Sequence, residues 1–68
     1  SYGAAHYGFG YAYFKKGLDE DNFDLSTNLF SNANTSFRKY VDGSHAKDPK
    51  KVSDSYLRIG DCFYVNKR

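Results

Sequence analysis

Residues 48–66, Asp48-Pro49 followed by KKVSDSYLRIGDCFYVN, decide the fold of this chain. Proline loses nothing at the first position of a helix, where the backbone N–H has no partner inside the helix, and Asp48 before it suits an N-cap. Apolar and small residues then recur at helical spacing: Val52, Tyr56, Ile59, Gly60 and Phe63. The pattern predicts an amphipathic helix that runs to about Asn66.

The first segment, residues 2–16, permits two interpretations when it is taken alone. Aromatic residues alternate with smaller ones from Tyr7 to Tyr13, which is typical of a strand. Ala5, Phe9 and Tyr13 also fall on one face of a helix. Intrinsic propensity favours the strand, because each glycine inside a helix costs up to about 1 kcal/mol relative to alanine.

An internal repeat resolves this ambiguity in favour of a helix. The stretch FGYAY at 9–13 has the layout of IGDCF at 59–63, a large apolar residue, glycine, two residues and an aromatic. The offset of 50 residues (13 against 63) also matches His6 with Tyr56. We therefore expect residues 3–16 to be helical, with Gly17 as the C-cap. The glycine that both copies share should let a neighbouring helix approach closely.

Between the two copies, residues 26–42 carry the pattern of another amphipathic helix. Its apolar stripe comprises Phe30, Ala33, Phe37, Tyr40 and Val41. Ser26 or Thr27 is the expected N-cap, and Gly43 in a left-handed conformation is the expected C-cap. The acidic stretch before it predicts a loop over residues 17–25.

Length and composition set further bounds. Sixty-eight residues make one small domain, and a single cysteine excludes an internal disulfide. Ten Lys and Arg against eight Asp and Glu give a net charge of +2, too weak to imply a nucleic-acid or membrane partner. No apolar run reaches the roughly 18 residues that a membrane span needs.

Catalytic and metal chemistry find little support in the residue pattern. Cys62 has no histidine near it in sequence and is expected to be a small buried residue, and His6 is expected to pack within the aromatic stripe. A calcium loop starting at Asp19 would have phenylalanine, as at Phe23, where oxygen ligands are needed. The sequence therefore predicts no catalytic residue, no metal site and no cofactor.

These features together resemble the tetratricopeptide repeat, a helix–turn–helix unit. The residues at the spacing of the family's first helix are Phe9, Gly10, Tyr13 and Gly17. Ala33 and Phe37 match the small residue and the phenylalanine of the second helix, and Pro49 resembles the closing proline. The period is longer than usual, as in the repeats of bacterial cell-envelope members of the family.

The resemblance implies an all-α fold, an antiparallel helix-turn-helix repeat of about three helices. Residues 1–47 would form the first repeat, with helices over 3–16 and 26–42 and the acidic loop over 17–25. Residues 48–68 would form the first helix of a second, truncated repeat, as expected for a fragment of a longer chain. The implied location is the bacterial periplasm or cell envelope.

The resemblance also implies a non-catalytic scaffold for protein–protein interaction. A peptide or partner protein would bind on a concave face lined by the first helices of successive repeats. The positions on that face are Tyr7, Tyr11, Phe14, Leu57, Asp61 and Tyr64. Three occupants remain open for these residues: a partner, neighbouring repeats outside this chain, or a second copy of the chain.

A third helix without its own partner predicts an exposed apolar patch. The residues of this patch are Val52, Tyr56, Ile59 and Phe63. Because water disfavours such a patch, we expect self-association or cover by further repeats.

Nucleic-acid binding through aromatic stacking is the alternative function. It would use a mild basic cluster: Arg38, Lys39, Lys47, Lys50 and Lys51. Aspartates such as Asp42, Asp48 and Asp54 are interleaved with this cluster and weaken its field. An ordinary solvated surface is the simpler expectation, without a nucleic-acid partner.

Overall fold

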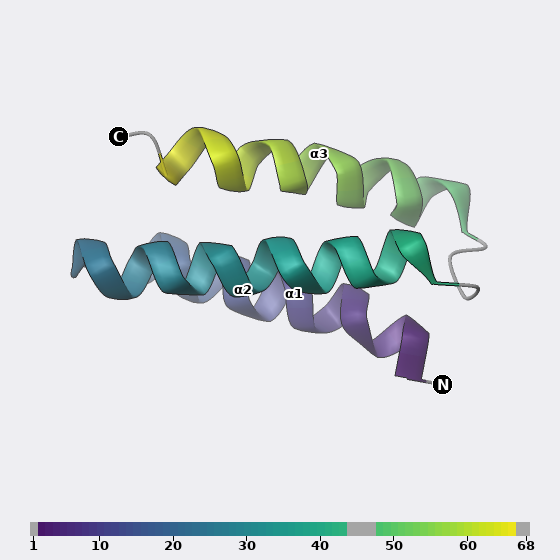
Figure 1. The fold of residues 1–68 in the computed structure, drawn as a ribbon, viewed down its shortest axis with the longest axis horizontal. Helices are drawn as coiled ribbons and strands as arrows, with labels where there is room; N and C mark the ends of the chain where they lie inside the picture. The colour runs from purple at the N-terminus through teal and green to yellow at the C-terminus, as the bar shows by residue number, and fades with distance from the viewer. Residues whose placement is uncertain (1, 44–47, 67–68) are drawn as a thin grey trace.

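Three helices make up the part of the chain that the computed structural model describes, residues 2–43 and 48–66: α1 (Tyr2–Asp19), α2 (Phe23–Asp42) and α3 (Pro49–Asn66). These residues contain no strand. α1 and α2 form an antiparallel hairpin, and α3 lies along α2 on the other side (Figure 1). The all-α class is confirmed, and so is the helical interpretation of the first segment.

The connection between α1 and α2 is shorter than the sequence pattern suggested. Helix α1 runs through Gly17 to Asp19, and only residues 20–22 separate it from α2, so the predicted loop over 17–25 is wrong in its bounds. The N-cap of α2 is Asn22, not Ser26 or Thr27, and its side chain accepts a hydrogen bond from the N–H three residues on (3.0 Å). Ser26 instead donates its hydroxyl to the Gly17 carbonyl (2.8 Å), which fastens the two helices at the turn.

The end of α2 and the start of α3 follow the sequence signals more closely. Gly43 follows α2 as expected, but its φ of −81° and ψ of 157° are extended, so the left-handed cap is wrong. Asp48 is the N-cap of α3, since its Oδ1 accepts the N–H of Lys50 at 3.0 Å and Pro49 opens the helix. Asp48 and Pro49 therefore set the start of α3 as predicted.

The core gathers around α2, whose predicted apolar stripe is buried from Phe30 to Tyr40, whereas Val41 is half-buried. Phe30, Ala33 and Phe37 are at most 1% exposed, and Phe14 of α1 packs against them. Helix α3 adds two buried residues to the same cluster, Ile59 and Cys62. α2 is therefore packed from two sides, by α1 and by α3.

The exposed apolar patch predicted along α3 is correct only in part. Tyr56 and Phe63 are 60% and 50% exposed, whereas Val52 is half-buried. Ile59 is only 8% exposed, so its place in the patch was wrong. Residues spaced by three and four span two neighbouring faces of α3, so the sequence pattern did not separate these faces. Helix α2 covers the face that holds Ile59.

Two glycines of α1 lie directly against phenylalanine rings of α2. A Cβ added at Gly10 would stand 2.6–2.8 Å from ring carbons of Phe37, and one at Gly17 would stand 3.0–3.1 Å from Phe30. Such distances leave no room for a methyl group at Gly10. The expected close approach is thus found at Gly10, whereas a Cβ at Gly60 would point into open space, with nothing beyond its own stretch of helix backbone within 4 Å.

Replacing these repeat-related glycines with alanine should change stability in opposite directions. Gly10→Ala should lower the free energy of unfolding by about 1–3 kcal/mol, because the methyl group overpacks against Phe37. Gly60→Ala should raise it by up to about 1 kcal/mol, because its methyl group meets open space and alanine favours the helix. Urea unfolding followed by circular dichroism measures both. A Gly10→Ala chain as stable as the unaltered chain would contradict the contact.

Candidate interaction face

The predicted face residues on α1 are engaged within the molecule. Phe14 is 9% exposed and meets Phe30 edge-on, with ring centroids 5.5 Å apart. The rings of Tyr7 and Tyr11 stand 6.1 and 5.2 Å from that of Phe37, also edge-on, an arrangement that aromatic pairs favour. These three side chains therefore form the packing face of α1 toward α2.

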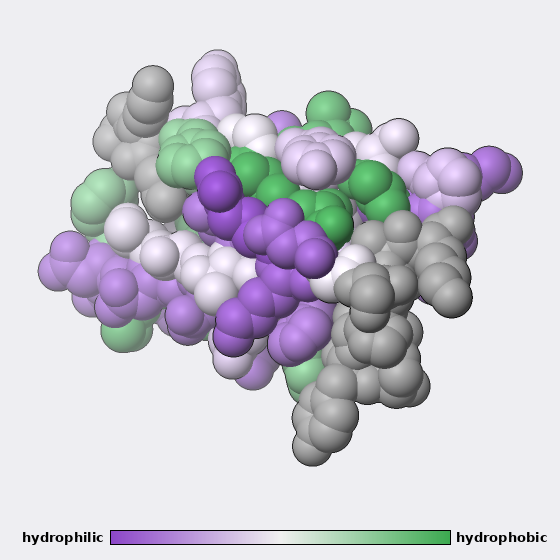
Figure 2. All heavy atoms as spheres, turned by 45° about the vertical axis from the view of Figure 1, so that its right-hand side comes forward, coloured by the Kyte–Doolittle hydropathy of each residue, from purple (hydrophilic) through white to green (hydrophobic). Residues whose placement is uncertain are grey.

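The predicted face residues on α3 lie open instead. Leu57 is 60% and Tyr64 is 78% exposed. Asp61 is half-buried and forms an ion pair with Arg58, whose Nη1 lies 2.5 Å from Oδ2 of Asp61. Tyr56 and Phe63 extend this apolar surface, which we call the α3 face and define as Tyr56, Leu57, Gly60, Asp61, Phe63 and Tyr64. Figure 2 shows hydrophobic and pale side chains gathered over α3, along the upper part of the molecule.

The two halves of the predicted site are equivalent positions of the internal repeat rather than two walls of one groove. The residue numbers of equivalent positions differ by 50, so Tyr7 corresponds to Leu57, Gly10 to Gly60 and Phe14 to Tyr64. Helix α2 covers the first member of each pair. The second member of each pair is exposed.

The reverse holds on the opposite side of the two related helices. Ser55, Ile59 and Cys62 of α3 are buried on the side that α2 covers. Their counterparts on α1 are all exposed: Ala5, Phe9 at 52% and Ala12. α2 thus fills one face of α1 and a different face of α3, which leaves each helix one uncovered apolar face.

A cluster of polar side chains joins α1 directly to α3. The carboxylate of Asp54 accepts the hydroxyl of Tyr7 at 2.6 Å and also that of Tyr11. Arg58 donates its Nε–H to the Tyr11 hydroxyl at 3.2 Å and stands 3.6 Å from Asp54. Lys51 places its Nζ over the Tyr7 ring, 5.4 Å from the centroid. This cluster fixes the rotation of α3, and with it which side chains α3 leaves exposed.

The ionisation of the cluster follows from these hydrogen bonds. The Tyr11 and Tyr7 hydroxyls stabilise the charged carboxylate and hold the pKa of Asp54 below its ordinary 3.8, with Arg58 adding a smaller effect. The hydrogen bond to the Asp54 carboxylate raises the pKa of Tyr7 well above its usual value. Tyr7 is therefore a neutral donor, and Asp54 remains charged to a lower pH than in an unfolded chain.

Arg38 of α2 contacts the edge of the α3 face. Its guanidinium lies over the Phe63 ring, 5.9 Å from the centroid, and its Nε–H donates to Asn34 one turn earlier (3.1 Å). This contact leaves half of Phe63 exposed. Of the predicted basic cluster, Arg38 is thus used in an aromatic contact, Lys39, Lys50 and Lys51 are exposed, and Lys47 lies outside the described residues.

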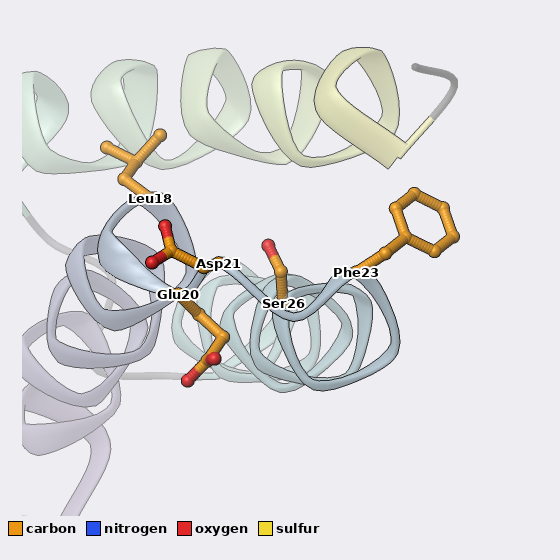
Figure 3. A pocket seen from close by; sticks show the side chains of 5 residues that line it. All are labelled: Leu18, Glu20, Asp21, Phe23 and Ser26. Atoms are coloured by element: carbon orange, nitrogen blue, oxygen red, sulfur yellow. The ribbon is translucent and has the colours of Figure 1, made fainter.

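A hollow of about 390 Å³ lies at the turn between α1 and α2. It is lined by Leu18, Glu20, Asp21, Phe23 and Ser26. In Figure 3, Glu20 points away from Leu18, so its carboxylate does not close over the hollow. The buried hydroxyl of Ser26, which lines the hollow, already donates to the Gly17 carbonyl.

The structure gives no support to nucleophilic chemistry at the single cysteine. Cys62 is 1% exposed, and burial raises its pKa to about 11, with a smaller effect of Asp61. A thiol with that pKa is protonated near neutral pH and is a poor nucleophile. His6 is half-buried and meets Phe9 edge-on at 6.4 Å, in line with its expected packing role, whereas His45 lies outside the described residues.

Comparisons with known proteins provide no family for the chain. No protein-family model, no curated protein and no solved structure matches it. Within residues 2–43 and 48–66, no group of three or more His, Cys, Asp or Glu side chains could hold a metal ion. None of the helices described there is long and apolar enough to cross a membrane.

Sequence reasoning missed the polar cluster around Asp54 and Arg58. Both residues occupy charged positions of an amphipathic helix, which ordinarily face water. The available signal was their spacing of four, which places them on one face of α3, beside Leu57 and Asp61. Which face of α1 they meet depends on the rotation of α3, and the pattern does not fix that rotation.

Removing one phenol hydroxyl tests the polar cluster. Tyr11→Phe keeps the ring against Phe37 but deletes both hydrogen bonds of the hydroxyl, and should lower the free energy of unfolding by about 1 kcal/mol. Tyr13→Phe is the matched control, since its hydroxyl lies outside the cluster. Equal stability of the two variants in urea unfolding would contradict the role of the cluster.

The same cluster predicts how stability depends on pH. Because the folded-state pKa of Asp54 is lowered, its contribution is present above the ordinary pKa of 3.8 and is lost as pH falls through the folded-state value. The unaltered chain should therefore lose more stability than Asp54→Asn between pH values just above and well below 3.8. Urea unfolding across this window measures the difference, and parallel curves for the two chains would contradict it.

Proposed function

We propose that this protein is a non-catalytic protein-interaction scaffold of helical-repeat type, similar to tetratricopeptide proteins, whose α3 face binds a peptide or partner protein. A bacterial cell-envelope setting is part of this proposal and rests on the sequence resemblance. The observation that carries it is the exposure of two bulky side chains, Leu57 at 60% and Tyr64 at 78%, one helical turn on either side of Gly60.

The composition of the α3 face favours recognition. Tyrosine and phenylalanine offer large contact areas at low cost in side-chain entropy, and they recur at the centres of protein interfaces. A half-buried carboxylate, Asp61, adds a polar group whose position Arg58 fixes. A rigid aromatic surface with one oriented charge suits a partner that combines an apolar side chain with a hydrogen-bond donor.

The face is also held by a rigid support. The opposite side of α3 is anchored in the core through Ile59 and Cys62, and the polar cluster at Asp54 ties the helix to α1. The backbone that carries the exposed residues therefore does not need to be ordered when a partner binds, which lowers the entropic cost of association.

A peptide library displayed on phage and selected on the whole chain tests this function. We expect enriched peptides to bind the unaltered chain and to bind the double variant Leu57→Ser, Tyr64→Ser about tenfold more weakly or worse, because the variant loses two apolar anchors. The matched control is Leu18→Ser, Phe23→Ser, which alters two exposed apolar residues outside the α3 face, beside the turn between α1 and α2. Peptides that lose equal affinity for both variants would contradict the assignment of the face.

A further inference from the structure

We propose that α3 opens from the α1–α2 hairpin as a single unit, ahead of global unfolding, and that the polar cluster around Asp54 sets how rarely it opens. The opening exposes Cys62, the single cysteine of the chain, so α3 controls access to the only thiol. This inference concerns a conformational device and does not depend on the proposed function. Its basis is the difference between the two interfaces of α2.

The interface between α1 and α2 holds the largest fully buried rings. Phe37 lies against Gly10 and Phe30 lies against Gly17, and both rings are at most 1% exposed. At the turn, the buried hydroxyl of Ser26 donates to the Gly17 carbonyl (2.8 Å). Separating α1 from α2 would expose both rings to water, so this separation amounts to loss of the core.

The interface between α2 and α3 buries smaller side chains. The buried residues of α3 are Ser55, Ile59 and Cys62, whereas each aromatic side chain of α3 is at least 50% exposed. Ser55 donates its hydroxyl to the Lys51 carbonyl of the same helix (2.7 Å), and this hydrogen bond persists when α3 leaves. Opening of α3 therefore exposes less apolar surface than separation of the hairpin, and costs less free energy.

Within residues 2–43 and 48–66, every hydrogen bond that joins α3 to another helix involves one of two phenol hydroxyls of α1. Asp54 accepts from Tyr7 (2.6 Å) and from Tyr11, and Arg58 donates to Tyr11 (3.2 Å). The ion pairs of Arg58 with Asp54 and Asp61 lie within α3 and remain when the helix leaves. Opening thus breaks one compact set of hydrogen bonds and leaves the Asp54 carboxylate paired.

The position of Cys62 makes its thiol a reporter of this opening. The side chain is 1% exposed in the closed state, in the same core cluster as Ala33 and Phe37 of α2. A reagent larger than water cannot reach the sulfur while α3 is docked. Movement of α3 alone uncovers it, because Cys62 lies on the side of α3 that α2 covers.

Labelling of Cys62 in the whole chain with a nitrophenyl disulfide reagent tests the inference. The Cys62 thiolate attacks the disulfide of the reagent, forms a mixed disulfide and releases one coloured nitrothiophenolate, whose absorbance is followed. The reagent is kept dilute, so that the rate reflects the opening equilibrium. We expect Tyr11→Phe to raise the labelling rate about fivefold, because it deletes two hydrogen bonds that only the docked α3 makes.

Ser26→Ala is the matched control, because it also removes a hydroxyl, but at the turn between α1 and α2. Urea unfolding should show lower global stability for both variants. Ser26→Ala should nevertheless label at the rate of the unaltered chain, since α3 opens without separating α1 from α2. Equal acceleration by the two variants would overturn the inference, because the thiol would then react through global unfolding. An unchanged rate for Tyr11→Phe would overturn the role of the polar cluster.

Amide hydrogen exchange of the unaltered chain provides a measurement that needs no variant. The slowest amides of α3 should exchange together and faster than the slowest amides of α2. Their exchange should also depend less steeply on urea, because opening of α3 exposes less surface than global unfolding. A common rate with the same urea dependence in both helices would overturn the separate opening of α3.

Discussion

The close contact of Gly10 with Phe37 sets the geometry of the whole molecule. A Cβ at this position would overlap the ring, so glycine is what lets α1 approach α2 closely enough to bury Phe30 and Phe37. Chains of this length bury little surface, and about 60% of what the unfolded chain exposes is a typical share. A core built on a few phenylalanine rings therefore depends on this approach, and α3 completes it from the other side.

The internal repeat explains why the chain has both a core and an open aromatic face. Related helices α1 and α3 use different faces against the single helix between them. On α1 the covered face is the one with Gly10, whereas on α3 it is the one with Ile59 and Cys62. Each helix consequently exposes the face that its relative buries. The exposed surface therefore arises because a single helix, α2, covers only one face of each related helix. The chemistry of the exposed surface resembles that of a packing surface.

The class of the fold and the start of α3 could be predicted because local signals carried them, namely the Asp48-Pro49 cap and the repeated FGYAY and IGDCF stretches. The turn after α1 could not, because Gly17 has the appearance of a helix cap while it serves as a packing notch under Phe30. The candidate face was predicted as one surface. Its division between core and solvent depends on which helix lies beside α1, and a single sequence does not contain that information.

Tyrosine accessibility in solution tests the central claim that equivalent positions of the two related helices differ in cover. Photochemically induced dynamic nuclear polarisation in NMR enhances only tyrosine rings that a dye can reach. The account predicts strong enhancement for Tyr56 and Tyr64, which are 60% and 78% exposed, and none for Tyr40 at 3%. Tyr7, held against Phe37 and bound to Asp54, should remain weak. A silent Tyr64, or a Tyr7 signal as strong as that of Tyr64, would contradict the account.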